Sequence, residues 1–202
     1  KKWESAADAA AVVIEANGGL NSLSNNRLQF YLNENNTDII WRKDYNNSRN
    51  LEVDHFPPSL YGTGRLNPTQ NLVDAFPTAD GYPINNPASA YDNNNPYSNR
   101  DPRLGTYIVY NSSKLKNATI NTVNDTKDGV NMIAESSTRT GYYMKKLLNE
   151  NVNLTRGLLV SQRHFQTLMR VTEAFLIYAE AANEAWGPDG KGSNNYSSKE
   201  II

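Results

Sequence analysis

The segment that most constrains the fold is the amphipathic stretch from Arg170 to Ala185, RVTEAFLIYAEAANEA. Its apolar residues recur every three or four positions, which is the period of one face of an α-helix. Its alanines make the helix thin, so a neighbouring helix can pack closely against it. Gly187 and Pro188 then predict the end of the helix. The apolar stripe consists of Leu168, Val171, Phe175, Tyr178, Ala182 and Trp186.

A second alanine-rich helix is predicted at the start of the chain, from Lys2 to Ala16, ending near Asn17 and Gly18. Alanine-rich helices near both ends of the sequence favour the packing of paired helices, as in tetratricopeptide repeats. Ser197 to Ile202 has the pattern of the first turn of another helix. Lys1 already lies within a helical pattern, and the helix that starts at Ser197 is cut short at Ile202. We therefore expect residues 1–202 to be one domain that is truncated at both ends.

The middle of the chain, from Leu20 to Arg156, is rich in asparagine, tyrosine, proline and glycine, which favour turns and loops. No hydrophobic run long enough for a helix occurs between Arg42 and Asn71. Disordered segments are poor in aromatic residues, whereas this region has many, so we expect ordered loops with exposed aromatic faces. The aromatic residues are Trp41, Tyr45, Phe56, Tyr61, Tyr82, Tyr91 and Tyr97.

A few short elements are expected within this region. Strand-forming residues predict strands at Thr37 to Trp41 and at Thr106 to Tyr110. Gln70 to Phe76 has helical spacing, with Thr69 as the N-cap and Leu72, Val73 and Phe76 buried. In the string NRDPRL, Asp101 before a proline predicts a turn or the start of a helix.

Composition excludes several classes of function. The net charge is −1 and the sequence pI is about 6.2, so there is no excess of positive charge to bind nucleic acid or a membrane surface. The chain has no cysteine, which excludes disulfides and thiolate metal sites. No apolar run reaches the roughly 18 residues that a transmembrane helix needs.

The segment Asp38 to Tyr45, DIIWRKDY, has the side chains that a neutral sugar requires. Aromatic rings stack on the C–H faces of a sugar, whereas guanidinium, amide and carboxylate groups bind its hydroxyls. We therefore predict Trp41, Tyr45 and Tyr61 as stacking residues and Arg42 as a hydrogen-bond donor. The alternative is structural, because a tryptophan at the end of a short strand is more often a core residue.

Catalytic motifs are absent from the sequence, as are recognisable metal and cofactor motifs. His55 and His164 are far apart and are interpreted as structural. A glycoside hydrolase would need two carboxyl groups about 5 to 10 Å apart, and the sequence offers only unranked candidates. These are Asp38, Asp44, Asp54, Glu173 and Glu180. The sequence therefore predicts no enzyme, no metal and no cofactor.

Three strings, NPTQNLVDAF, NRDPRL and the helix at Arg170 to Ala185, resemble in this order the later part of the SusD/RagB family of Bacteroidetes. The Lys2 to Ala16 helix also resembles a helix of that family. The resemblance implies a mainly α fold, in which tetratricopeptide-like alanine-rich helices pack against an irregular, loop-rich body with a few short strands. It further implies a surface lipoprotein of the outer membrane whose lipid anchor lies outside this chain.

The function implied by this resemblance is the non-catalytic capture of an oligosaccharide. The sugar would be delivered to a SusC-like, TonB-dependent barrel in the outer membrane. Two alternatives remain open from the residues themselves. One is a glycan-active hydrolase, and the other is a helical protein-interaction scaffold without a small-molecule ligand.

Overall fold

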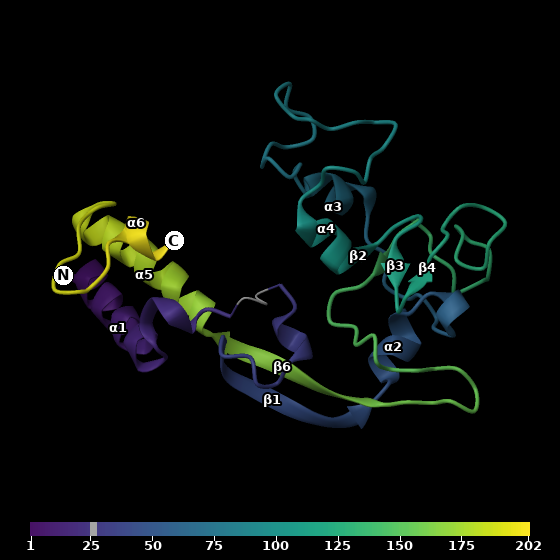
Figure 1. Cartoon of the computed structure of the whole chain (residues 1–202), viewed down its shortest axis with the longest axis horizontal. Helices are drawn as coiled ribbons and strands as arrows, with labels where there is room; N and C mark the ends of the chain where they lie inside the picture. The colour runs from purple at the N-terminus through teal and green to yellow at the C-terminus, as the bar shows by residue number, and fades with distance from the viewer. Residues whose placement is uncertain (25–27) are drawn as a thin grey trace. The chain divides into compact units, whose positions relative to one another are not determined.

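A computed structural model describes residues 1–24 and 28–202 (Figure 1). The α-helices are α1 (Lys2–Ala16), α2 (Asn50–His55), α3 (Gln70–Ala75), α4 (Pro102–Tyr107), α5 (Val171–Trp186) and α6 (Ser198–Ile201). The 3-10 helices are η1 (Gly19–Ser22), η2 (Phe30–Leu32) and η3 (Pro58–Leu60). The strands are β1 (Ile39–Ser48), β2 (Ile108–Val109), β3 (Lys114–Leu115), β4 (Ala118–Thr119), β5 (Tyr143–Met144) and β6 (Gln162–Arg170). Of the residues that the structure describes, 32% are helical and 16% are strand, so helix is the main regular structure, as predicted.

The contacts divide the chain into two compact units. Unit 1 consists of Lys1–Tyr45 and Phe165–Ile202, and unit 2 consists of Asn46–His164. Each unit has its own hydrophobic core. The single domain predicted from the sequence stays a prediction. None of the helices in the described part of the chain has both the length and the apolar character that crossing a membrane requires.

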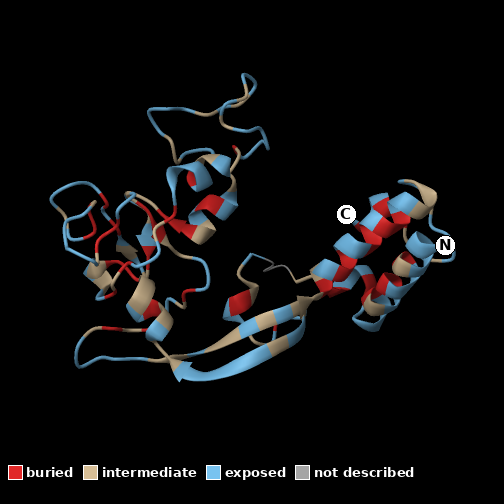
Figure 2. Ribbon diagram, turned by 180° about the vertical axis from the view of Figure 1, so that it is seen from behind, coloured by how far each residue is buried: buried red, intermediate tan, exposed pale blue. Residues whose placement is uncertain are grey.

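Unit 1 is built on the packing of α1 against α5, which lie side by side in Figure 1. Ala7 and Ala10 of α1 and Ala179 and Ala182 of α5 are buried, and the buried faces of the two helices are red in Figure 2. Methyl side chains allow two helices to approach to about 8 Å, the short end of the usual range. The predicted packing of the alanine-rich helices against each other is therefore present, and Tyr178, fully buried, fills the core beside them.

The ends of these helices follow the sequence signals. Gly187, with a φ of 79°, ends α5, and its N–H donates to the Asn183 carbonyl. A positive φ at this point favours glycine, which has no Cβ to clash. At α6 the Ser197 hydroxyl accepts from the backbone N–H of Glu200, and the Glu200 side chain accepts from the backbone N–H of Ser197. This capping box explains why so short a helix forms.

Strands β1 and β6 form a two-stranded sheet that the sequence predicted only in part. The predicted strand from Thr37 to Trp41 is wrong in its bounds, since β1 begins at Ile39 and continues through polar residues to Ser48. Strand β6 was not predicted, and Leu168, assigned to the helical stripe, lies within it and is 45% exposed. The pairing of β1 with β6 overrides the low strand propensity of the polar residues in β1.

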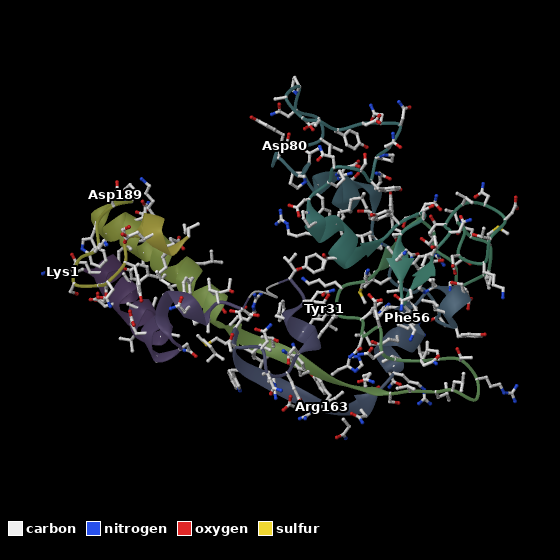
Figure 3. The ribbon with its side chains drawn as sticks, viewed as in Figure 1. Lys1, Tyr31, Phe56, Asp80, Arg163 and Asp189 are labelled. Atoms are coloured by element: carbon white, nitrogen blue, oxygen red, sulfur yellow. The ribbon has the colours of Figure 1, made fainter. Side chains whose placement is uncertain are left out.

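Unit 2 has two apolar clusters, and Phe56 is fully buried in the larger one. The expectation that Phe56 is exposed is therefore wrong, and Figure 3 labels this ring beside the end of α2. Helix α2 was also not expected, because it lacks a long hydrophobic run. Its Glu52 is fully buried and accepts from the backbone N–H of Asn149 at 2.8 Å, so a long-range hydrogen bond stabilises a short helix.

The string NRDPRL forms a helix start, as predicted. Asp101 is the N-cap of α4 and accepts from the backbone N–H of Arg103 at 2.8 Å, while hydrogen bonds from Arg103 lower the pKa of the Asp101 carboxyl. Helix α4 continues from this cap to Tyr107. The predicted strand from Thr106 to Tyr110 is therefore wrong in its bounds, and only Ile108–Val109 form a strand, β2. Strand β2 pairs with β5 in antiparallel register, Ile108 opposite Met144.

Arg100 connects two of the strings that carried the family resemblance. Its guanidinium donates to the carbonyls of Val73 at 2.6 Å and Phe76 at 2.8 Å, at the end of α3, and to the Pro96 carbonyl at 2.8 Å. Helix α3 itself has the predicted Thr69 N-cap. Val73 is buried as predicted, but Leu72 is 47% exposed. The arginine thus adds hydrogen bonds to carbonyls at the C-terminal end of the helix, where intrahelical donors run out.

Candidate functional site

The candidate site in unit 1 is a strand face that carries two exposed aromatic rings. Side chains alternate along a strand, so Trp41, Lys43 and Tyr45 of β1 share one face. Trp41 is 64% exposed and Tyr45 is 43% exposed. Four residues along a strand span roughly 13 Å. The two aromatic side chains therefore present an extended surface, which we call the aromatic face.

Tyr45 is held in place by polar contacts, whereas Trp41 is not. The Tyr45 hydroxyl donates to Oε1 of Gln166, on β6, at 3.0 Å. The Lys43 ammonium lies 5.4 Å from the centre of the Tyr45 ring. The indole of Trp41 forms no hydrogen bond with any residue that the structure describes. The aromatic face thus combines a positioned phenol with an indole whose N–H is available.

Arg42 lies on the opposite face of β1 and is already engaged. Its Nε donates to Oδ1 of Asp44 at 2.8 Å, and its Nη1 donates to the Glu34 carbonyl. Its Nη2 lies 3.8 Å from Oε2 of Glu34, and its guanidinium lies 5.3 Å from the centre of the Phe165 ring. These contacts hold the strand to its surroundings. The sugar-contacting role of Arg42 stays a prediction.

Tyr61 belongs to unit 2, whereas Trp41, Arg42 and Tyr45 belong to unit 1. Tyr61 follows η3, is 62% exposed, and has a left-handed backbone with a φ of 66°. Such a conformation costs a bulky residue roughly 1 kcal/mol or more, and it recurs at functional sites. The structure therefore presents an exposed ring at Tyr61, in a different unit from the aromatic face.

The other aromatic residues of the loop region divide into exposed and packed rings. Tyr82 is 44% exposed, in line with the expectation of exposed loop aromatics. Tyr97 instead stacks on Tyr110 with ring centres 4.2 Å apart, and its hydroxyl lies 3.2 Å from that of Tyr142. Tyr91 lies under the guanidinium of Arg100, which is 5.4 Å from its ring centre. These rings support the fold of the loops.

The start of β1 is fixed by Asp38, which is fully buried. Its carboxylate accepts from the backbone N–H of Thr172 at 2.8 Å and from Nε of Arg170 at 2.7 Å. Its carbonyl accepts from the N–H of Val171 at 2.8 Å. Asp38 therefore caps the N-terminus of α5 from a distant part of the chain. Trp41 follows it by three residues, so this cap also positions the aromatic face.

The candidate carboxylates that the sequence offered have structural, ion-paired or solvent-exposed surroundings. Asp38 serves as a cap, Asp44 is paired with Arg42, and Asp54 lies 3.4 Å from Nη1 of Arg65. Glu173 and Glu180 are exposed on α5. Their positions are those of solvated or ion-paired carboxylates.

The histidines have structural surroundings. His164 Nε2 lies 3.0 Å from Oε1 of the buried Glu52. Burial lowers the pKa of His55, and its Nδ1 is buried without a partner among the described residues. This environment favours neutral imidazole at His55.

The sequence interpretation missed Gln166 and Lys43 as members of the aromatic face. Gln166 lies on β6, and that strand was not predicted, so its approach to Tyr45 was not visible. The alternation of Trp41, Lys43 and Tyr45 was visible, but the predicted strand ended at Trp41. Pairing between segments 121 residues apart decides this part of the site.

These features define a class of mainly helical, loop-rich proteins that expose aromatic side chains on a strand. A family model described as SusD family matches residues 28–198, and the chain belongs to this family. No curated protein matches the chain.

Two solved structures from Bacteroides fragilis are similar to the chain. A SusD-like carbohydrate binding protein has a TM-score of 0.70 and 25% identity, and the match covers 91% of this chain and 37% of that one. A SusD-like protein has a TM-score of 0.58 and 29% identity, covering 78% of this chain and 35% of that one. The chain thus spans little more than a third of the length of these proteins.

Proposed function

We propose that this chain is part of a non-catalytic glycan-binding protein that captures oligosaccharides at the bacterial cell surface. The observation that carries the proposal is the aromatic face, on which Trp41 and Tyr45 are exposed together. Family membership supports it, as does a similar solved structure described as a carbohydrate binding protein. Flat rings exposed in this way suit the C–H patches of a sugar chain.

In this proposal the two rings make the apolar contacts and nearby polar groups bind the hydroxyls. The indole N–H of Trp41 donates to a sugar oxygen, and the Gln166 amide and Lys43 ammonium contact hydroxyls beside Tyr45. Because the rings are four residues apart on one strand, an oligosaccharide contacts both better than a single sugar does.

Arg42 and Tyr61 are further proposed contacts. Arg42 keeps its hydrogen bonds to Asp44 and Glu34 and offers its remaining N–H groups on the other face of β1. Tyr61 offers a ring in unit 2. Each is proposed as a separate contact.

We also propose the remaining features that the family resemblance implies. The packing of α1 against α5 supports a tetratricopeptide-like arrangement. The complete protein would be a lipid-anchored protein of the outer membrane that delivers its sugar to a SusC-like, TonB-dependent transporter.

The experiment is calorimetric titration of the full-length protein with a panel of neutral oligosaccharides. Trp41→Ala is expected to weaken binding at least tenfold, which corresponds to about 1.4 kcal/mol. The matched control is Trp3→Ala, since Trp3 is also exposed, at 47%, but lies on α1. The control variant should bind as the wild type does, and both variants should keep the wild-type circular dichroism.

Two outcomes would contradict non-catalytic glycan binding, and a third would contradict the location of the site. Release of new reducing ends from any oligosaccharide would identify a hydrolase. Absence of binding across the panel would favour a protein-interaction scaffold. Binding that Trp3→Ala weakens as much as Trp41→Ala would place the site away from the aromatic face.

A further inference from the structure

A second candidate binding site is a polar hollow of about 280 Å³ within unit 2, which we call the arginine hollow. Two segments far apart in the sequence build it. Its lining residues are Gly64, Arg65, Asn67, Glu135, Ser137 and Arg139. The volume is close to the lower end of ligand sites, about 300 Å³. A hollow of this size suits one sugar unit or one end of a longer chain.

The backbone around the arginine hollow is held rigidly. The Asn67 side chain donates to the Gly64 carbonyl at 2.8 Å and accepts from the N–H of Arg139 at 3.0 Å, so it ties the two segments together. The Ser137 hydroxyl donates to the Lys127 carbonyl at 2.6 Å. A Cβ at Gly64 would lie 2.4 Å from the Ser136 carbonyl oxygen, so the segments are in close contact. A rigid site loses little entropy when a ligand binds.

The two guanidinium groups of the hollow are available to a ligand. The Arg139 guanidinium forms no hydrogen bond or ion pair with any residue in the described ranges. Arg65 lies 3.4 Å from Asp54, but their side chains are 68% and 42% exposed, so the pair is weak. A guanidinium matches the two oxygens of a carboxylate or sulfate with parallel hydrogen bonds.

Glu135 distinguishes an acidic sugar from a simple anion. Glu135 lines the same hollow, its carboxylate has no partner within the described residues, and its backbone has a positive φ of 64°. A carboxylate repels an anion but accepts hydrogen bonds from hydroxyls. The hollow therefore offers two cationic groups for an anionic substituent and a carboxylate with the Asn67 amide for hydroxyls.

We propose that the arginine hollow binds an acidic sugar unit, through a carboxylate or sulfate held by Arg65 and Arg139 and hydroxyls held by Glu135 and Asn67. This inference rests on the proposed function, because it names the class of glycan that the protein captures. It depends on different residues, in unit 2, from those of the aromatic face.

The test compares pairs of ligands that differ only in charge, using the full-length protein. One pair is a galacturonate oligosaccharide and its methyl ester, and the other is a sulfated galactose oligosaccharide and its unsulfated form. Wild type is expected to bind the charged member of at least one pair tenfold or more tightly. Arg139→Gln and Arg65→Gln should each abolish most of this preference. The pair in which the preference occurs identifies a carboxylate or a sulfate as the bound group.

The matched control is Arg156→Gln, because Arg156 is an exposed arginine of unit 2 that does not line the hollow. This variant should keep the full preference. Glu135→Gln should enlarge the preference, because removing the carboxylate's repulsion strengthens binding of the charged ligands, whereas a purely structural Glu135 would leave the preference unchanged. Circular dichroism checks that each variant folds.

Two results overturn the inference. The first is equal binding of the charged and uncharged members in both pairs. The second is an equal loss of the charge preference in Arg139→Gln and in Arg156→Gln. If either result occurs while neutral glycans still bind through Trp41, the arginine hollow fails and the proposed function stands. If wild type binds none of the saccharides, both fail.

Discussion

Asp38 and Thr172 are joined across 134 residues of sequence by a hydrogen bond of 2.8 Å from the Thr172 backbone N–H to the Asp38 carboxylate. The Thr172 hydroxyl also donates to this carboxylate, at 2.8 Å. The cap lies where β6 ends and α5 begins, and Asp38 directly precedes β1. A single buried carboxylate thus ties the alanine-rich helix to the strand that carries the aromatic face.

Asp38→Ala should lower the free energy of unfolding of unit 1 by roughly 3 kcal/mol, the low end for loss of one partner from a buried ion pair. The reason is that Arg170 and the N–H groups of α5 lose their acceptor. Denaturant unfolding followed by helical circular dichroism measures the change. Asp44→Ala is the control, because Asp44 is an exposed partner of Arg42 and should cost less than about 1 kcal/mol. Similar losses in the two variants would contradict the capping role.

Tyr45→Phe should retain most of the affinity for oligosaccharide, whereas Tyr45→Ala should lose it at least severalfold. Phenylalanine keeps the ring and removes only the hydrogen bond to Gln166, whose net contribution is about 1 kcal/mol. Titration calorimetry with the same oligosaccharide separates the two variants. If phenylalanine weakens binding as much as alanine does, the hydroxyl rather than the ring face makes the contact.

Gly64→Ala should destabilise unit 2 more than Gly81→Ala does. Both glycines have positive φ, 48° and 88°, so each alanine is strained by roughly 1 kcal/mol. At Gly64 the new Cβ would also lie 2.4 Å from the Ser136 carbonyl oxygen, whereas at Gly81 it meets no atom within 4 Å. We expect a further loss of about 2 kcal/mol at Gly64 from overpacking. Thermal unfolding of the two variants measures the difference, and equal melting temperatures would refute the close contact.

The stability that Tyr143 contributes should depend on pH in the alkaline range. Burial raises the pKa of its phenol to about 12 from the usual 10.0, because the charged form is poorly solvated. The contribution is therefore complete below pH 10 and is lost as the pH rises through about 12. The difference in unfolding free energy between wild type and Tyr143→Phe should narrow over this range. A difference in unfolding free energy that stays constant over this range would show that Tyr143 does not ionise with a raised pKa. The control is Tyr82→Phe, because the Tyr82 ring is exposed.

Local signals in the sequence predicted the elements whose stability is local. The helix at Val171–Trp186 has an apolar face of helical period and a glycine at its end, so its helical course and its C-terminus follow from neighbouring residues, whereas the distant Asp38 caps its start. The cap of α3 by Thr69 and the capping box at Ser197 are also decided within one turn. Such features can be predicted because their partners are three or four residues away.

Elements that depend on distant partners were missed or misplaced. Strand β6 and the polar part of β1 exist because they pair with each other. Helix α2 depends on the buried Glu52, which accepts from a residue 97 positions away. Phe56 looked like an exposed loop aromatic but completes a core formed with residues from 109 to 154. None of these relationships leaves a periodic signal in the sequence.

The sequence by itself determined the alanine-rich helices, their C-terminal ends and the family, because these depend on short-range periodicity and on strings of residues in a fixed order. Only the tertiary structure decided which aromatic rings are exposed and where charges gather. Exposure depends on what packs against a side chain, and the hydrogen-bond partners of the Tyr45 hydroxyl and of the Arg139 backbone N–H come from segments far along the chain. Burial and long-range pairing are therefore properties of the folded chain rather than of any local pattern.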